Sequence, residues 1–248
     1  MNADIGTVVW KEYREIFRGP GSRFNVLMVI VSVALVGVLL PLQQGAGFVA
    51  SPMTLLYCFW IPMMIVPSII ADSFAGERER HTLETLLAGR LSDRAILFGK
   101  LCAIVLYAWG LTLLGLLMSL VTVNVVAAAG GHLLLFPALL ALSAVTMSFL
   151  ASWLFAGLGV LISLRSPTVQ KAQQTLAAVT LLPMAPLIAL PLLLGDEKLG
   201  ALLMGVVSRV LSNVPVVVGM AMLLLLFIDL TVVWISLARF QRARLILD

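Results

Sequence analysis

Six apolar runs, each long enough to cross a lipid bilayer, divide this chain. They cover residues 24–42, 51–72, 95–127, 133–164, 175–194 and 215–238. About 20 mostly apolar residues span the hydrocarbon as an α-helix, and a helix satisfies its own backbone hydrogen bonds where water is absent. A transmembrane β-barrel would alternate polar and apolar residues, which these runs do not. The sequence therefore predicts an all-α polytopic membrane protein with six transmembrane helices.

The overall composition excludes a water-soluble domain. Of the 248 residues, 61% are hydrophobic and only 11% are charged, whereas about a quarter of the residues of a soluble domain are charged. A soluble protein of this length could not bury so much apolar surface. We therefore expect a multi-pass protein of the plasma membrane, which in a prokaryote is the inner (cytoplasmic) membrane.

Lysine and arginine gather on one side of the predicted membrane. Fourteen of the sixteen lie before the first run, in the charged segment (residues 71–100), in the 165–174 loop or in the C-terminal tail, and two, Lys198 and Arg209, lie on the other side. Cytoplasmic loops carry the excess of these residues. Both termini, the charged segment and the 165–174 loop are therefore predicted to be cytoplasmic. Because topology accounts for the net charge of +4, no nucleic-acid partner is expected.

Residues 1–23 form a unit of their own before the first span, and residues 24–248 form the six-helix domain. Within the first unit, residues 5–18 mix apolar and charged positions, and Trp10 is an aromatic residue of the kind that favours the membrane interface. This pattern predicts an amphipathic helix along the membrane surface. The sequence Gly-Pro-Gly at 19–21 would end that helix and turn the chain into the bilayer.

The charged segment has a helical pattern of its own. Leu83, Leu86 and Leu87 have the spacing of one helical face, and Gly89 tolerates the left-handed conformation that ends many helices. A short amphipathic helix is therefore predicted over about 77–88. The alternative is a solvated loop that only separates two membrane spans.

Other positions have a narrower meaning. Residues 199–213 are too short to span and are predicted to form a re-entrant or interfacial helix on the outer side. Asp229 lies deep in the last span, where a carboxylate is costly and often functional. We treat Asp229 and Asn124 as candidates for a translocation path or for polar contacts between helices.

Several kinds of chemistry have no motif here. The chain has no phosphate-binding loop of the form G-x-x-x-x-G-K-[ST], no H-E-x-x-H and no cluster of Cys and His ligands. Its two histidines, His81 and His132, are predicted to lie on opposite sides of the membrane. We therefore expect no enzymatic activity, no metal site and no bound cofactor in this chain.

The charged segment resembles that of the permease subunits of type-2 ABC exporters. The second span leads into F-x-G-E-R-E-x-x-T-L-E-x-L-L, and the third begins with L-S-x-x-x-I-L-x-G-K. The matching positions are Phe74, Gly76, Glu77, Arg78, Glu79, Thr82, Leu83, Glu84, Leu86, Leu87, Leu91, Ser92, Ile96, Leu97, Gly99 and Lys100. His81 departs from the pattern, because a glycine is common there in such permeases.

The resemblance implies a division of labour between subunits. A separate cytoplasmic ATPase dimer would bind ATP and magnesium, and two permease chains, usually identical, would form the path through the lipid membrane. The 77–88 helix would be the coupling helix that docks on the ATPase, and residues 5–18 would be the connecting helix beside it. The coupling residues would be Glu77, Glu79, Arg80, Leu83, Glu84, Leu86, Leu87, Arg90 and Arg94, and the connecting-helix residues Trp10, Lys11, Arg14 and Arg18.

The cargo is less constrained than the architecture. Polar residues within the spans are scarce, which favours a hydrophobic or amphipathic cargo such as a lipid, drug or peptide. Two other functions stay open. A membrane scaffold that recruits a cytoplasmic partner would bind it without nucleotide-dependent transport, and a secondary transporter would depend on an ion gradient without an ATPase.

Overall fold

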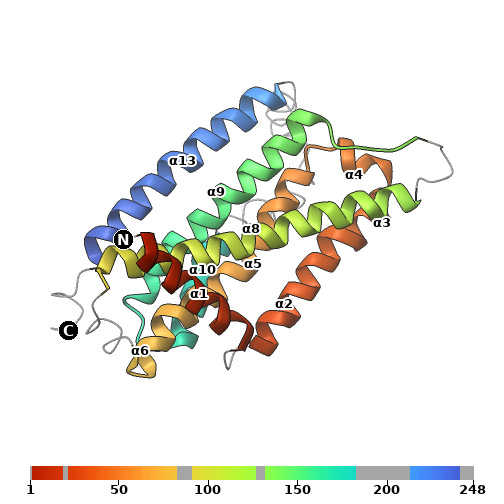
Figure 1. Cartoon of the computed structure of the whole chain (residues 1–248). Helices are drawn as coiled ribbons and strands as arrows, with labels where there is room; N and C mark the ends of the chain where they lie inside the picture. The colour runs from red at the N-terminus through yellow and green to blue at the C-terminus, as the bar shows by residue number, and fades with distance from the viewer. Residues whose placement is uncertain (1, 19–21, 83–90, 127–131, 183–212, 241–248) are drawn as a thin grey trace, which may run out of the picture.

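The computed structural model describes residues 2–18, 22–82, 91–126, 132–182 and 213–240, and throughout these residues it contains helices and no strands. Five helical segments of the described chain are long and apolar enough to cross a membrane: Val26–Gln44, Thr54–Glu79, Asp93–Val126, Ala138–Ser163 and Val214–Arg239. This is the architecture of a polytopic membrane protein. Figure 1 shows the long helices running side by side in one bundle.

The first helix lies across the bundle. Helix α1 (Asn2–Arg18) packs against α8 (Asp93–Val126), and Figure 1 shows it crossing the long helices at one end instead of running along them. Its buried residues Val8, Glu12 and Ile16 recur every four positions, so they lie on one helical face. Residues 5–18, predicted to form an amphipathic helix, lie within α1, and the position of this helix along the membrane surface stays a prediction.

The first span consists of three helical pieces. Helix α2 (Ser22–Ala34) continues through a π-helical turn, η1 (Leu35–Leu39), into α3 (Leu40–Gln44), and the short α4 (Ala46–Ala50) follows. At Gly37 this span approaches α8 so closely that a Cβ would lie 2.9 Å from the Cβ of Met118. The hydroxyl of Thr122 donates a hydrogen bond to the carbonyl of Gly37 (2.8 Å). Small residues allow such close helix contacts in membranes.

The second span is the centre of the core. Helix α5 (Thr54–Ala71) continues through a second π-helical turn, η2 (Asp72–Gly76), into α6 (Glu77–Glu79). Most of α5 is buried, because it packs against both α8 and α9 (Ala138–Ser163). A Cβ on Gly159 of α9 would overlap the side chain of Ile70. This close contact fixes α5 against α9.

The fourth span starts later than predicted. Residues 133–137 are apolar but not helical, and α9 begins after Pro137. Proline disfavours helical geometry in the residue before it and is well suited to a helix start. The side chain of Asn124 holds this non-helical stretch, because its Nδ2 donates to the carbonyl of Leu134 and its Oδ1 accepts from the Leu134 amide, both at 2.8 Å.

The last two described helices complete the bundle. Helix α10 (Val169–Leu181) begins the fifth predicted span, and the rest of that span and the predicted re-entrant helix at 199–213 lie outside the described residues. Helix α13 (Val214–Arg239) matches the sixth predicted span and packs mainly against α9. Only a narrow face of α13 is buried, formed by Asp229, Val232 and Ser236.

Candidate functional site: a buried ionic cluster

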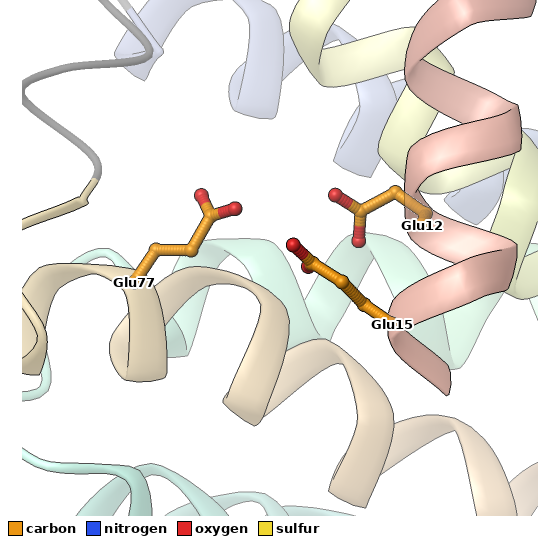
Figure 2. A group of neighbouring side chains, drawn as sticks. All are labelled: Glu12, Glu15 and Glu77. Atoms are coloured by element: carbon orange, nitrogen blue, oxygen red, sulfur yellow. The ribbon is translucent and has the colours of Figure 1, made fainter. Parts of the chain in front are cut away.

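Charged side chains from three distant parts of the sequence meet where α5 ends and α8 begins, at the end of the bundle predicted to face the cytoplasm. We call this group the ionic cluster; its members are Lys11 and Glu12 of α1, Ser73 of η2, Glu77 of α6 and Lys100 of α8. Figure 2 shows Glu12 and Glu15 on one helix facing Glu77 on another. The cluster therefore connects α1 to α6 and to α8, the helices on either side of residues 80–92.

Lys100 is the centre of the cluster. Its side chain is 0% exposed, and its Nζ lies 2.7 Å from Glu12 Oε1 and 2.9 Å from Glu77 Oε1. The same ammonium donates to the hydroxyl and the carbonyl of Ser73, at 3.0 and 3.1 Å, and the Ser73 hydroxyl donates to Glu12 Oε2 (2.8 Å). A buried charge is tolerated only when it is paired and hydrogen-bonded, and Lys100 meets both conditions.

Lys11 lies among three carboxylates. Its Nζ is 2.6 Å from Glu77 Oε1, 3.3 Å from Glu15 Oε1 and 3.4 Å from Glu12 Oε1. Within the described part of the chain, these three carboxylates are the group of acidic side chains placed closely enough to hold a metal ion. The ammonium of Lys11 occupies the position that an ion would need, and Lys100 supplies a second positive charge. The arrangement is that of a salt-bridge network, buried around Lys100 and partly exposed at Lys11 and Glu15.

The two α1 members of the cluster titrate away from their ordinary ranges. Burial opposes the charge of Glu12, but the charge and hydrogen bond of Lys100 outweigh burial, so the pKa of Glu12 is lowered. Burial also opposes the charge of Lys11, but the hydrogen bond and charge of Glu77 outweigh it, so the pKa of Lys11 is raised. Both residues are therefore charged at neutral pH.

Two glycine-containing motifs contribute to the ionic cluster. A Cβ on Gly99 would lie 2.6 Å from the Cβ of Val8, so glycine at this position lets α1 lie directly on α8, beside Lys100. In the other motif, the ring of Phe74 lies 5.3 Å from the Lys100 ammonium, within range of a cation–π interaction, and Glu77 follows three residues later. The F-x-G-E and G-K motifs therefore both supply residues of the same cluster.

The helix predicted over 77–88 does not begin as predicted. Residues 77–79 continue the second span, and the chain then turns at Arg80 and His81. His81 has a φ of 56°, in the left-handed region that glycine adopts without steric cost. Thr82 is again helical. The predicted helix is therefore interrupted by a turn, and its remaining part, residues 83–88, lies outside the described chain.

Three predicted coupling residues have partners within the chain. Glu77 is buried in the ionic cluster, and Glu79 Oε2 accepts a hydrogen bond from the amide of Val169, at the start of α10 (3.2 Å). Arg80 is exposed and pairs with Asp72 (3.3 Å). Arg94 is exposed in the first turn of α8. The other predicted coupling residues lie outside the described chain: Leu83, Glu84, Leu86, Leu87 and Arg90.

The predicted connecting-helix residues differ in their surroundings. Trp10 is exposed, and the guanidinium of Arg14 lies 5.6 Å from the centre of its ring. Lys11 belongs to the ionic cluster, and Arg18 is the last residue of α1. Glu12, Ser73 and Lys100 were not among the predicted site residues. The signal for Glu12 was its place four residues after Val8 and four before Ile16, on an otherwise apolar face.

The two polar candidates in the spans are also unlike each other. Asn124 uses its amide group to hold the backbone of Leu134 and also donates to the carbonyl of Leu120 (2.8 Å). Asp229 is buried in α13, and neither of its oxygens has a hydrogen-bond partner among the described residues. Asn124 therefore has hydrogen-bond partners and a structural role, whereas the carboxyl group of Asp229 has no hydrogen-bond partner among the described residues.

Comparison with the sequence models of protein families gives a match. The sequence model of the family described as ABC-2 type transporter matches residues 3–186, well over half of the chain. The match includes every member of the ionic cluster and ends before α13. None of the curated proteins compared with this chain matches it.

Proposed function

This chain belongs to the ABC-2 type transporter family, and from that premise we propose that it is the permease subunit of an ATP-driven exporter. Family membership makes it the membrane permease component of an ABC-type transporter, which is not itself catalytic. The proposal adds a separate cytoplasmic ATPase dimer that binds ATP and magnesium. It also adds a second, identical permease chain, so that two copies form the path for the cargo.

The observation that carries this proposal is the ionic cluster. It connects α1 to α6 and to α8, which lie on either side of residues 80–92 of the charged segment. Closure of an ATPase dimer must reach the membrane as a rigid-body movement. Because α1 is attached on both sides of residues 80–92, a force on these residues moves α1, α5 and α8 together.

The surface that meets the ATPase is proposed to lie between residues 80 and 94 of the charged segment. Arg80 and Arg94 are exposed at these two positions and can make polar contacts that set the register of docking. Residues 83–88 are proposed as the coupling helix, with Leu83, Leu86 and Leu87 as its apolar anchors. Glu77 and Glu79 are positioning residues, because their partners lie within this chain.

The remaining topology follows from the same proposal. Residues 175–194, whose first part lies in α10, supply the fifth of the six spans, and residues 199–213 supply the re-entrant element near the outer exit. Both termini and the charged segment face the cytoplasm, in the inner membrane of a prokaryote. Large apolar side chains cover the outward faces of α2 and α13 and are available to lipid or to the second permease chain. The cargo is hydrophobic or amphipathic.

Co-purification with a cytoplasmic ABC ATPase of the same organism tests the proposal. The chain and the ATPase are co-expressed, purified through a tag on the chain and assayed for ATP turnover in lipid nanodiscs. Leu83→Glu and Arg80→Glu are expected to reduce ATPase association or its coupling. Lys171→Glu is the matched control, since it makes the same charge change as Arg80→Glu at an exposed residue of α10. Failure of any ATPase to associate with the intact protein would contradict the proposal and favour a scaffold or a gradient-driven transporter.

A further inference from the structure

Asp229 is a buried carboxylate without a described partner. Its side chain is 5% exposed, and neither Oδ1 nor Oδ2 accepts a hydrogen bond from the described residues. Ten residues separate it from Arg239 at the end of α13, which is about 15 Å of helix at 1.5 Å per residue. Ionisable residues at such depth are costly and commonly mark substrate or ion pathways. The partner of Asp229 has therefore to be sought outside the described chain.

A groove along α9 and α13 leads toward this carboxylate. It consists of two adjoining cavities of about 470 and 420 Å³ that share Thr146 and Met222. The larger cavity lies near the N-terminal ends of both helices, and the smaller one reaches Leu226. Asp229 is not among the lining residues of either cavity and its oxygens are covered, but it lies one helical turn beyond Leu226 on the same side of α13. We call the two cavities together the α9–α13 groove.

The walls of the groove are mostly apolar, and the side-chain donors of Trp109 and Thr146 already have acceptors. Trp109 and Phe149 line the smaller cavity, but Nε1 of Trp109 donates to the carbonyl of Val145 (3.1 Å). The hydroxyl of Thr146 donates to the carbonyl of Leu142 (2.8 Å). A strongly polar cargo would lose its hydration here without gaining hydrogen bonds. The groove therefore suits a molecule with a large apolar surface.

Charge then decides between apolar molecules. A buried carboxyl group without a partner is most stable uncharged, and neither an anion nor a neutral molecule would give it a partner for its charged form. A cation would pair with it, and the faces of Trp109 and Phe149 attract cations as well. Each cavity is within the range of about 300–1,000 Å³ that is usual for small organic ligands. A hydrophobic body with one positive charge fits both features of the groove.

We propose that the α9–α13 groove binds cationic amphipathic molecules, with Asp229, one helical turn beyond its inner end, as the counter-charge. That the bound molecule is also the exported cargo rests on the proposed function above. Binding itself needs only this chain. It can therefore be measured without the ATPase, and failure of one proposal can be told from failure of the other.

Equilibrium binding with three matched probes tests the proposal. The full chain is placed in nanodiscs of zwitterionic phosphatidylcholine, and binding of tetraphenylphosphonium, neutral triphenylphosphine oxide and anionic tetraphenylborate is measured against empty nanodiscs. The cation is expected to bind saturably and at least tenfold more tightly than the neutral probe. Asp229→Asn is expected to weaken cation binding at least tenfold and to leave binding of the neutral probe unchanged.

Two further variants separate the groove from general effects of charge and folding. Asp72→Asn removes a carboxylate at the end of a different span and is expected to bind the cation like the unaltered chain. Thr146→Phe fills the point that both cavities share and is expected to weaken binding of the cation and the neutral probe alike. Three results would overturn the proposal. Asp229→Asn could bind the cation as tightly as the unaltered chain, the unaltered chain could bind the cation and the neutral probe equally tightly, or Thr146→Phe could still bind the cation tightly. If the cation does not bind but the ATPase associates, the exporter stands and this cargo class is wrong.

Discussion

Replacing Lys100 by methionine should strongly destabilise the protein. Methionine keeps most of the length of the side chain but removes the ammonium that pairs with Glu12 and Glu77. The two carboxylates are only 2% and 3% exposed, so water cannot replace the lost partner. Removing one member of a buried ion pair typically costs about 3–5 kcal/mol, because the other member stays buried and uncompensated.

The geometry narrows this range. The Lys11 ammonium, which remains after the substitution, lies 2.6 Å from Glu77 but farther from Glu12, at 3.4 Å. Glu77 is therefore still compensated, and most of the cost falls on Glu12. We expect Lys100→Met to reduce the free energy of unfolding by about 3 kcal/mol, at the lower end of the range for a broken buried pair.

The measurement is unfolding of the purified chain in mixed micelles, followed by circular dichroism as the denaturing detergent is increased. The control is Arg80→Met, which breaks the Arg80–Asp72 pair, whose side chains are 43% and 36% exposed. Exposed pairs are worth about 0–1 kcal/mol, so this variant should lose little stability. Raising the salt concentration should weaken the exposed pair and leave the buried cluster nearly unchanged.

A double-mutant cycle with Glu12→Gln shows whether the cost comes from the pair itself. Residues in one salt-bridge network show coupling energies of about 0.5–3 kcal/mol, so the double variant should be more stable than the sum of the single losses implies. Strictly additive losses would refute the argument. So would a Lys100→Met variant within about 0.5 kcal/mol of the unaltered chain, the usual range for surface substitutions.

Three other predictions concern stability and use the same unfolding assay. His81→Gly should stabilise the protein by about 0.5–1 kcal/mol, because φ is 56° at this residue; a loss would show that the His81 side chain makes a compensating contact. Gly159→Ala should cost about 1–3 kcal/mol by overlap with Ile70, whereas Gly110→Ala, with open space around it, should cost nothing. The pKa of Glu12 is lowered, so its contribution to the free energy of unfolding is present above the ordinary carboxyl pKa of 4.5 and is lost as the pH falls through the folded-state pKa. Glu12→Gln should therefore make the stability less sensitive to acid. An unchanged dependence of stability on pH would contradict this.

The spans were predictable because each one is a local property of the chain. Hydrophobic length placed the last span at 215–238, and the helix runs from Val214 to Arg239. The error at 133–137 arose from treating every apolar residue as helical. Pro137 was a usable signal there, because the residue before a proline avoids helical geometry.

The ionic cluster was much less predictable, because it depends on distant pairing. The notable charge of residues 77–80 indicated a surface for a partner, but Glu77 faces inward to Lys11, 66 positions earlier in the chain. Hydrophobic patterns do not state which charged residues will meet. Local patterns still held part of the answer, since Glu12 interrupts the apolar face of α1 and Gly99 permits close contact beside Lys100.

Substitutions in the ionic cluster and at the α9–α13 groove should impair different properties, because the two sites lie on different parts of the bundle. Close contacts at Gly99 and Gly159 fix α1 to α8 and α9 to α5, so the cluster belongs to a tightly packed body. Helix α13 joins that body mainly through the narrow face that includes Asp229. In the assembled transporter, Lys100→Met should therefore impair coupling to ATP turnover while cation binding is kept, at temperatures where the variant stays folded. Asp229→Asn should do the reverse, with basal ATP turnover kept and its stimulation by tetraphenylphosphonium lost. If each variant impaired both properties equally, one common structural defect would explain them, and the division between a coupling body and a binding groove would be wrong.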